Sequence, residues 1–492
     1  MREGRGGSLG FYFIMIDKKT KIVCTISDIN CDVDFIRDLY ERGLNVVRMN
    51  TAHANDEGIK RLIANVRTVS ENIPILIDTK GPEIRTTTFP DDYTVKALIF
   101  EPGEKVRMVG NPEGRTTHDE ISMNYANFCT DVPVGATVLI DDGEIAFSII
   151  DKQGDVLIAE AQNHGELGQR KSVNVPGVSI KLPSLTDKDR HNIDLAIAEG
   201  IDFIAHSFVR SKQDVLDIQQ ILDAQHSKIK IIAKIENQEG VDNIDEILDV
   251  AYGVMVARGD LGIEVAQEKI PGIQRMLIRK CMQRHKPVIV ATQMLHTMIK
   301  NPRPTRAEIS DIANAVFAHT DAVMLSGETA YGQFPREAVQ TMAQVCKEAE
   351  LELESEPYAV PRNLNKMSEN TNIYLCKHAA IASESLGVKS IITSNNTGVT
   401  SRTQCSFRPQ VPIYALCNDM HIVRILGLSY GVQPYFVEFS DPSMSGHMFQ
   451  QLGIRQLLAK GIIADDELVA CLMGATSKGA YSLSINTVNR LK

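Results

Sequence analysis

Short runs of apolar and β-branched residues alternate along the chain with stretches in which apolar residues recur at helical spacing. This alternation is typical of βα units around a parallel sheet, whose strands are buried on both faces. The runs predict strands at 21–26, 45–50, 75–80, 203–209, 231–236, 253–258, 287–293 and 322–326. Eight such strands predict an α/β fold with a closed (β/α)8 TIM barrel, whose reactive groups lie at the C-terminal strand ends.

The spacing is interrupted once, between the third predicted strand and a predicted helix at 187–199. About a hundred residues separate them, which is too many for an ordinary loop. Within this stretch apolar and polar residues alternate with period two and are broken by DDG and QGD turns, as in half-buried strands. We therefore predict an inserted β-barrel domain at 86–181, which can act as a lid.

After the eighth predicted strand, the proline-interrupted stretch SEPYAVPRN has the character of a linker. Beyond it, helical stretches alternate with the apolar runs SIITS, PIYAL, VQPYFV and ELVACLM, which predicts a small α/β sheet domain. The predicted layout is a leader at 1–16, a catalytic barrel at 17–85 and 182–355, the lid at 86–181 and the α/β domain at 356–492.

The composition is that of an ordinary globular protein, with 43% hydrophobic and 23% charged residues. A net charge of −10 provides no basic field, so we expect neither nucleic acid nor a membrane as a partner. No apolar run approaches the roughly 20 residues of a membrane span. The nine cysteines include no C-x-x-C pair, which argues against a zinc cluster or a disulfide scaffold and favours a cytoplasmic location.

Polar residues collect at the C-terminal ends of the predicted strands, as an active site on a barrel requires. Lys234 and Glu236 end the fifth strand, and strand alternation points both side chains to the same side. Such a pair can simply close the barrel as an ion pair. Alternatively, Lys234 supplies a cation for a phosphoryl or enolate oxygen, and Glu236 supplies a ligand for a divalent metal ion.

Asp260 follows the sixth predicted strand, between Gly259 and Gly262. These glycines let backbone amides approach a bound anion, while Glu236 and Asp260 together could hold Mg²⁺ with substrate oxygens. The plainer interpretation is a tight turn that needs glycine at positive φ.

The second and third predicted strands end in a basic group and in a set of oxygen donors. The basic residues are Arg48, Lys80 and Arg85, which suit a multiply charged phosphate. The oxygen donors are Asn50, Asp78 and the Thr79 carbonyl, which could bind a further cation. Such residues are usually solvated surface when they occur singly. The chain has no P-loop and no Rossmann glycine motif, so side chains would have to hold a phosphate.

Several longer segments carry a family resemblance. They are TKIVCTI at 20–26, MNTAH at 49–53, DTKGPEIRT at 78–86, KIEN at 234–237, MVARGDLGIE at 255–264 and KPVIVATQMLHTMIKNPRPTRAEISDIANAV at 286–316, with VNVPGV and LSGETAYG. In this order, over nearly the whole chain, they resemble the bacterial type of the three-domain pyruvate kinase family. The resemblance implies a barrel, an inserted β lid and a C-terminal α/β regulatory domain, assembled as a homotetramer.

The resemblance also implies phosphoryl transfer from phosphoenolpyruvate to ADP, giving pyruvate and ATP, with Mg²⁺ or Mn²⁺ as cofactor. Such a reaction asks for charge neutralisation and alignment rather than for a covalent protein nucleophile. The implied roles are Lys234 for the phosphoryl group in flight, Glu236 and Asp260 for Mg²⁺, Arg48 for the substrate phosphate, Thr292 for the substrate and its protonation, the amides of Gly259 and Asp260 for the substrate carboxylate, and His53, Arg85 and Lys171 for the nucleotide.

The chain departs from the family pattern where a monovalent cation would bind. The family's N-F-S-H segment reads N-T-A-H here, so a serine hydroxyl that helps to bind K⁺ is replaced by Ala52. Glu83, however, occupies the position where glutamate accompanies K⁺ dependence in this family. We therefore expect K⁺ to be used, with Asn50, Asp78 and Thr79 as its ligands.

The effector loop of the family is also altered. Thr397, Gly398 and Thr400 could bind a sugar phosphate at a helix N-terminus. A plain capping turn explains the same residues.

Two other functions are open on the sequence alone. Another Mg²⁺-dependent barrel enzyme acting on enolpyruvate, such as an aldolase-like lyase, needs no lid over a nucleotide, so ADP dependence separates it from a kinase. A catalytically silent metabolite sensor is suggested by Ala52 and by the altered TISDIN loop, but it would not need the charged set around Lys234.

Overall fold

The computed structural model describes residues 18–51, 54–355, 370–394, 397–439, 446–474 and 481–491. The eight predicted strands are present and close into a barrel in the order β1-β16-β15-β14-β13-β12-β3-β2. Their bounds are β1 Lys21–Thr25, β2 Val46–Asn50, β3 Ile75–Asp78, β12 Phe203–His206, β13 Lys230–Ile235, β14 Gly253–Ala257, β15 Val288–Ala291 and β16 Ala322–Leu325. The strand residues are almost entirely buried, which explains their apolar runs. The predicted (β/α)8 barrel is confirmed.

Most barrel strands end one to three residues earlier than the sequence predicted, and two of these ends have a backbone cause. β12 stops at His206 because Phe208 has a φ of 55°, and β15 stops at Ala291 because Thr292 and Gln293 have φ values of 69° and 55°. These left-handed conformations leave the extended region, so the chain turns abruptly at the barrel mouth. The turns contain polar residues, among them Thr292 and Gln293, that the sequence pattern had assigned to strands.

Helices follow the strands around the barrel. They are α1 Val33–Glu41, α2 Asp56–Val69, α4 Asp187–Ala198, α5 Lys212–Ala224, α6 Gln238–Asp242, α7 Ile244–Val250, α8 Arg258–Glu264, α9 Ile270–Gln283, α10 Arg306–Phe317, α11 Gly327–Ala330 and α12 Pro335–Ser355, with the 3₁₀ turns η1 Gln267–Lys269 and η2 His296–Ile299. Local sequence fixes several starts. Thr186 and Asp189 form a capping box at α4, and Thr305 and Glu308 form another at α10.

The predicted insert between β3 and α4 is rich in strands. These are β4 Leu98–Phe100, β5 Lys105–Gly110, β6 Glu120–Met123, β7 Thr137–Ile140, β8 Ile145–Gln153, β9 Val156–Ala161, β10 Gly165–Leu167 and β11 Val173–Asn174, with the short helix α3 Phe128–Asp131. They pair as a six-stranded sheet, β11-β7-β8-β9-β5-β6, and a two-stranded sheet, β10-β4. Both sheets contribute to one core around Phe100, Phe128 and Phe147. The insert thus has a core of its own, and the strands that the period-two pattern predicted as a β-barrel pair as two sheets.

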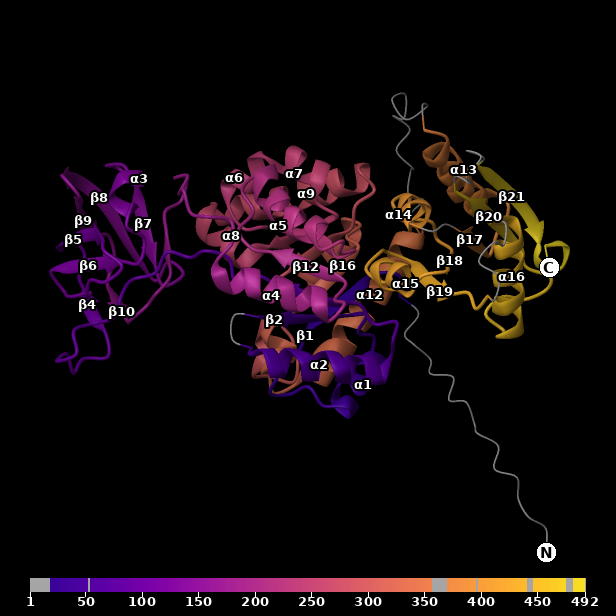
Figure 1. Ribbon diagram of the computed structural model, residues 1–492, viewed down its shortest axis with the longest axis horizontal. Helices are drawn as coiled ribbons and strands as arrows, with labels where there is room; N and C mark the ends of the chain where they lie inside the picture. The colour runs from indigo at the N-terminus through magenta and orange to yellow at the C-terminus, as the bar shows by residue number, and fades with distance from the viewer. Residues whose placement is uncertain are drawn as a thin grey trace, which may run out of the picture. The chain divides into compact units, whose positions relative to one another are not determined.

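The C-terminal part forms a five-stranded sheet in the order β19-β18-β17-β20-β21. Its elements are α13 Thr371–Ser385, β17 Ser390–Ser394, α14 Val399–Cys405, β18 Ile413–Cys417, α15 Met420–Leu426, β19 Val432–Phe436, α16 Gly446–Ala459, β20 Leu468–Met473, β21 Ser482–Thr487 and η3 Val488–Arg490. α13 packs against β20 and β21, and α16 packs against β17 (Figure 1). The sequence did not predict β21, a half-exposed, polar edge strand that pairs antiparallel with β20.

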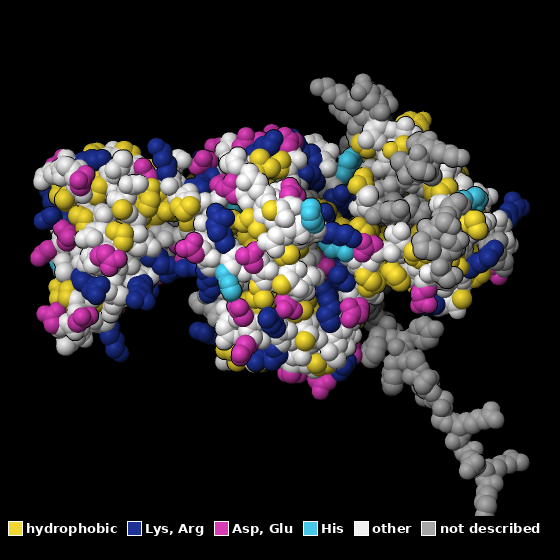
Figure 2. All heavy atoms as spheres, viewed as in Figure 1, with side chains coloured by type: hydrophobic (Ala, Val, Ile, Leu, Met, Phe, Trp, Pro, Cys, Tyr) yellow, Lys and Arg dark blue, Asp and Glu magenta, His cyan; other side chains and the backbone are white. Residues whose placement is uncertain are grey.

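Charge on the described surface is mixed. On the face drawn in Figure 2, Lys and Arg side chains are interspersed with Asp and Glu side chains. None of the helices in the described part of the chain has both the length and the apolar composition needed to span a membrane.

Candidate functional site

Residues 49–56 and 75–293 form one compact unit of the chain, and this unit contains most of the predicted site. Within it, the Lys234 ammonium is held between two buried carboxylates. Lys234 Nζ lies 2.9 Å from Glu236 Oε1 and 3.4 Å from Asp78 Oδ2. Lys234 and Glu236 therefore point to the same side, as strand alternation predicted. The Glu236 and Asp78 side chains are 1% and 3% exposed, whereas the Lys234 side chain is 12% exposed and thus only partly buried.

Asp260 joins this group from the first turn of α8 and lies beside Glu236. Burial and, next, the negative charge of Glu236 raise the pKa of Asp260 to about 7, although Lys234 opposes the rise. Two close carboxylates that repel each other fit a divalent cation, because its charge would offset the repulsion. No group of three or more His, Cys, Asp or Glu side chains in the described residues forms a metal site, so other oxygens would complete the coordination.

The turn interpretation of Gly259 and Gly262 is wrong. Both glycines belong to the helix α8, and neither is among the described glycines with positive φ. The Gly259 N–H donates to Thr292 Oγ1 at 2.8 Å. An amide contact between Gly259 and a substrate carboxylate would therefore have to replace this bond or share it.

Thr292 adopts a strained backbone conformation directly after β15. A φ of 69° is costly for a β-branched residue, and such strain is most often found at functional sites. The conformation is held by its neighbours, since Arg258 Nη2 donates to the Thr292 carbonyl at 2.6 Å and Gly259 donates to its hydroxyl. The Thr292 hydroxyl in turn donates to the Ala291 carbonyl at 2.6 Å. The threonine is thus fixed beside the start of α8.

The oxygen donors predicted for K⁺ lie at the ends of β2 and β3. Asp78 and Thr79 are buried, and Asn50 is exposed at the last position of β2. The Thr51 hydroxyl donates to the Asp78 carbonyl at 2.5 Å. The Thr79 carbonyl accepts a hydrogen bond from Ser207 at 2.7 Å, and a carbonyl oxygen has a second lone pair for a cation. This set of one carboxylate with neutral oxygens suits a hard cation.

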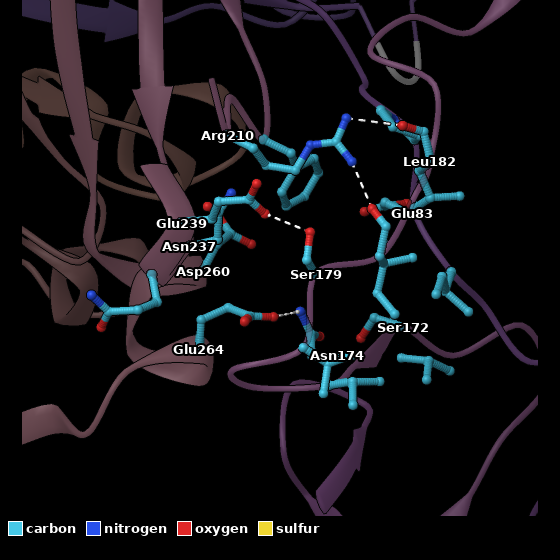
Figure 3. Close-up of a pocket in the computed structure, with 18 of the residues that line it drawn as sticks. Glu83, Ser172, Asn174, Ser179, Leu182, Arg210, Asn237, Glu239, Asp260 and Glu264 are labelled. Atoms are coloured by element: carbon cyan, nitrogen blue, oxygen red, sulfur yellow. Dashed lines mark hydrogen bonds between the residues drawn. The ribbon is translucent and has the colours of Figure 1, made fainter. Parts of the chain in front are cut away.

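Two residues predicted to bind nucleotide, Arg85 and Lys171, line a cavity of about 590 Å³ that also contains Asp260 (Figure 3). Arg85 Nε lies 2.8 Å from Glu83 Oε2, and Lys171 Nζ lies 2.6 Å from Asp141 Oδ2. Each cation is thus paired with a carboxylate at the cavity wall. Incoming phosphates would compete with these carboxylates for the cations.

Some other predicted site residues are not among those that line this cavity, and two positions of the predicted site region lie outside the described residues. Lys80 is at the surface, 4.0 Å from Glu83. Arg48 is buried in β2 and donates to Thr25 Oγ1 at 2.8 Å. His53 and Ala52 lie outside the described residues.

The cavity lies where the segment returning from the insert passes the loops after β13 and β14, and two hydrogen bonds connect these parts (Figure 3). Asn174 Nδ2 donates to Glu264 Oε1 at 3.1 Å, and Ser179 Oγ donates to Glu239 Oε2 at 3.0 Å. Burial raises the pKa of Glu264, although the bond from Asn174 opposes the rise. The cavity volume is in the range of small-molecule sites.

Arg210 holds the same returning segment. Its Nη1 and Nη2 atoms donate to the carbonyls of Ile180 and Leu182 at 2.7 and 2.9 Å (Figure 3). Nη2 also lies 3.2 Å from Asp214 Oδ1. Sequence reasoning missed Arg210, and it also missed Ser207 and Phe208, which contact Lys234 and Glu236. Their position directly after β12 could have drawn attention to them, because active-site residues of barrels follow the strands.

The residues proposed for an effector lie in the C-terminal part. Gly398 is the N-cap of α14 with a φ of 75°, and Thr397 is exposed. Thr400 is buried, and its hydroxyl donates to Asn372 Oδ1 at 3.1 Å. Thr400 therefore contacts α13 in this structure. The preceding Asn395 and Asn396 lie outside the described residues.

Comparisons with known proteins agree with this architecture. The family model for the pyruvate kinase barrel domain matches residues 17–339, and the model for the pyruvate kinase alpha/beta domain matches residues 374–488. The chain is 43% identical over 479 residues to the pyruvate kinase of Borreliella burgdorferi, covering 96% of this chain and 98% of that protein. It is 43% identical over 464 residues to the pyruvate kinase of Geobacillus stearothermophilus, covering 93% of this chain and 78% of that protein.

A solved structure gives the same result. The crystal structure of a pyruvate kinase from Cryptosporidium parvum matches with a TM-score of 0.86 and 34% identity, covering 96% of both chains. The chain therefore belongs to the pyruvate kinase family.

Proposed function

We propose that the chain carries out the reaction of its family, phosphoryl transfer from phosphoenolpyruvate to ADP, at the cluster of Lys234, Glu236, Asp260 and Thr292. The observation that carries this assignment is the Lys234 ammonium between two buried carboxylates, next to Asp260. In the reaction, the bond from phosphorus to the enol oxygen breaks and a bond to an oxygen of the ADP β-phosphate forms. The enol carbon then takes up a proton to give pyruvate.

Lys234 would stabilise the phosphoryl group while it moves between the two oxygens. Its ammonium is fixed by Glu236 and Asp78, so it is in place before the substrate arrives. A preorganised cation in a partly buried site stabilises developing negative charge more strongly than water does. This role needs no covalent bond to the protein, in keeping with a loose transition state.

Glu236 and Asp260 would hold the divalent cofactor, Mg²⁺ or Mn²⁺. When bound, this ion supplies positive charge that neutralises substrate oxygens. The fit rests on the two adjacent carboxylates, whose negative charges repel each other. The raised pKa of Asp260, caused first by burial and next by Glu236, agrees with this. Lys234 is shared between the carboxylates of Asp78 and Glu236.

Thr292 would bind the substrate and belong to the path that delivers the proton to the enol carbon. Its hydroxyl accepts a hydrogen bond from the Gly259 N–H and donates one to the Ala291 carbonyl. A hydroxyl that both accepts and donates hydrogen bonds can pass a proton along such a path. The amides of Gly259 and Asp260, in the first turn of α8, would bind the substrate carboxylate at a helix N-terminus.

Arg48 would bind the phosphate of phosphoenolpyruvate, and His53, Arg85 and Lys171 would bind the nucleotide phosphates. For Arg85 and Lys171 the support is their place in the cavity wall. For Arg48 and His53 the support is the motif in which they occur. K⁺ at Asn50, Asp78 and Thr79 would add to the charge that holds the phosphates.

The remaining features of the proposal concern the whole protein. Residues 86–181 would act as a lid, residues 356–492 as a regulatory domain with Thr397, Gly398 and Thr400 at a sugar-phosphate site, and residues 1–16 as a leader. The resemblance to the family supports a homotetramer. The nine cysteines are free and buried, which supports a cytoplasmic location.

A coupled assay for pyruvate formation tests the proposal. Pyruvate should form only when phosphoenolpyruvate, ADP and Mg²⁺ or Mn²⁺ are all present, with ATP in equal amount. Pyruvate without ADP would indicate a lyase, and no turnover with intact binding of phosphoenolpyruvate would indicate a sensor. Adding K⁺ and a panel of sugar phosphates separately tests the cation and effector sites, and light scattering tests the tetramer.

A further inference from the structure

The segment directly after β12 contacts both charged groups at the centre of the site. Ser207 Oγ lies 2.8 Å from Lys234 Nζ, and the Phe208 N–H donates to Glu236 Oε2 at 2.7 Å. Ser207 is 3% exposed, so water does not readily replace its contact with the lysine. One short turn therefore touches the ammonium through a side chain and the carboxylate through the backbone.

The direction of each hydrogen bond at Ser207 is determined by chemistry. An ammonium group can only donate, so Ser207 Oγ accepts from Lys234. The hydroxyl has one proton, which it donates to the Thr79 carbonyl at 2.7 Å. Because a carbonyl oxygen can only accept, the order is fixed as Lys234 to Ser207 to Thr79. The serine cannot turn away from the lysine without giving up both bonds.

The backbone around Ser207 is also constrained. The Ser207 N–H donates to Thr79 Oγ1 at 2.9 Å, and Phe208 is held at a φ of 55°. A Cβ atom at Gly81 would lie 2.8 Å from the Phe208 ring and 3.1 Å from Ser207 Cβ, so the loop after β3 and this turn are in close contact. Lysine side chains have many rotamers, whereas this turn has little freedom.

We propose that Ser207 is a positioning residue that fixes the direction of the Lys234 ammonium toward the transferring phosphoryl group. The proposal rests on the role assigned above to Lys234. Without the serine hydroxyl, Glu236 and Asp78 still attract the ammonium, but it loses the buried acceptor that directs one of its N–H bonds. Loss of positioning should therefore appear in kcat, since the ammonium acts mainly in the transition state.

The test compares Ser207→Ala with the wild type. We expect kcat to fall by about 10- to 100-fold, as for other groups that orient an active-site residue, with little change in KM for phosphoenolpyruvate or ADP. Binding of Mn²⁺, measured by electron paramagnetic resonance without substrates, should not change, because Glu236 is held by the Phe208 amide. A loss of Mn²⁺ affinity that matches the loss of kcat would overturn the proposal.

A double-mutant cycle separates positioning from a general structural role. In a Lys234→Met background, Ser207→Ala should cause no further loss, because the group it positions is absent. A further loss of the same size in that background would refute the proposal, and so would an unchanged kcat in the single variant. If Lys234→Met itself retains the wild-type kcat, the catalytic role assigned to Lys234 is wrong. That outcome refutes the proposed function and is distinguishable from a failure of the positioning role of Ser207.

Two further variants serve as a matched control and as a substitute for Ser207→Ala. Ser383→Ala removes another buried serine hydroxyl that donates to a carbonyl at 2.7 Å, but in α13, and it should keep wild-type kcat. If Ser207→Ala does not fold, Ser207→Cys carries the same test, because a thiol of similar shape is a weak hydrogen-bonding group. Ser207→Cys should also have a lower kcat than the wild type and an unchanged affinity for Mn²⁺.

Discussion

The guanidinium of Arg408 and the carboxylate of Asp321 form a two-point ion pair in the protein interior. Nη1 lies 2.9 Å from Oδ1 and Nη2 lies 3.1 Å from Oδ2, and both side chains are 3% exposed. The Tyr430 N–H also donates to Asp321, and the Arg408 guanidinium lies 4.5 Å from the Tyr430 ring centroid. The pair thus connects the residue before β16 with the loop after α14.

Arg408→Met should destabilise the protein by about 3–5 kcal/mol, because it leaves the Asp321 charge buried without its partner. Urea unfolding followed by circular dichroism measures the change. The control is Arg284→Met, which breaks ion pairs with the exposed Asp245 and Asp249 and should cost at most about 1 kcal/mol for each. Equal losses in the two variants would mean that burial does not determine the importance of the Arg408 pair.

Lys234→Met should lower kcat by about 10²-fold or more and leave the fold intact, since its charge is needed chiefly in the transition state. Steady-state kinetics and circular dichroism check both parts. Lys280→Met provides a matched control, because Lys280 forms an ion pair with Asp245 on the outside of the barrel. A Lys234 variant with more than half of the wild-type kcat would contradict the assignment.

Activity should rise with K⁺, and Ala52→Ser should lower the K⁺ concentration needed for half-maximal rate. The reason is that serine adds back one neutral oxygen, whereas the charge that attracts the ion is already supplied by Asp78. The maximal rate should change little. Equal rates in K⁺ and in a tetramethylammonium buffer free of Na⁺ and K⁺ would show that the site is not used.

His319 should make the protein less stable in acid. Burial and, next, the charge of Arg408 lower the pKa of His319 to about 4, whereas the unfolded side chain titrates near 6.5. Between these values the unfolded state binds a proton that the folded state does not, so stability falls as pH drops from about 6.5 to about 4. His319→Asn, which tolerates the φ of 66°, should lose less stability over this range.

The urea midpoints of the wild type and of His319→Asn are compared at several pH values. Because other titrating groups are the same in both proteins, their contributions cancel in the difference. His191→Asn is the control, because His191 is exposed beside Asp56. If His319→Asn and the wild type lose stability in parallel, titration of His319 is not the cause.

Arg210→Met should loosen the segment that returns from the insert, because the carbonyls of Ile180 and Leu182 lose their charged donor. Hydrogen bonds to charged groups contribute about 1.5–3 kcal/mol, so amide exchange around residues 179–184 should become about tenfold faster or more. Exchange measured by mass spectrometry checks this. Arg190→Met, at an exposed position of α4, should leave it unchanged.

The sequence by itself determined the fold class and the charged centre of the site. Parallel barrel strands are buried on both faces, so they must be apolar runs, and the polar residue that ends such a run must lie at the barrel mouth. Strand alternation placed Lys234 and Glu236 on the same side without any tertiary information. These features depend only on neighbours within one strand.

Only the tertiary structure decided how residues from different strands meet. The contact of Ser207 with Lys234 and Thr79 depends on strand order, on register and on the left-handed turn at Phe208. Likewise, the strain at Thr292 and the pairing of Arg408 with Asp321 arise from loops whose conformation is set by what they pack against. Hydrophobic periodicity reports which side of an element is buried but not which residue lies opposite, and that second fact determines which groups can act together.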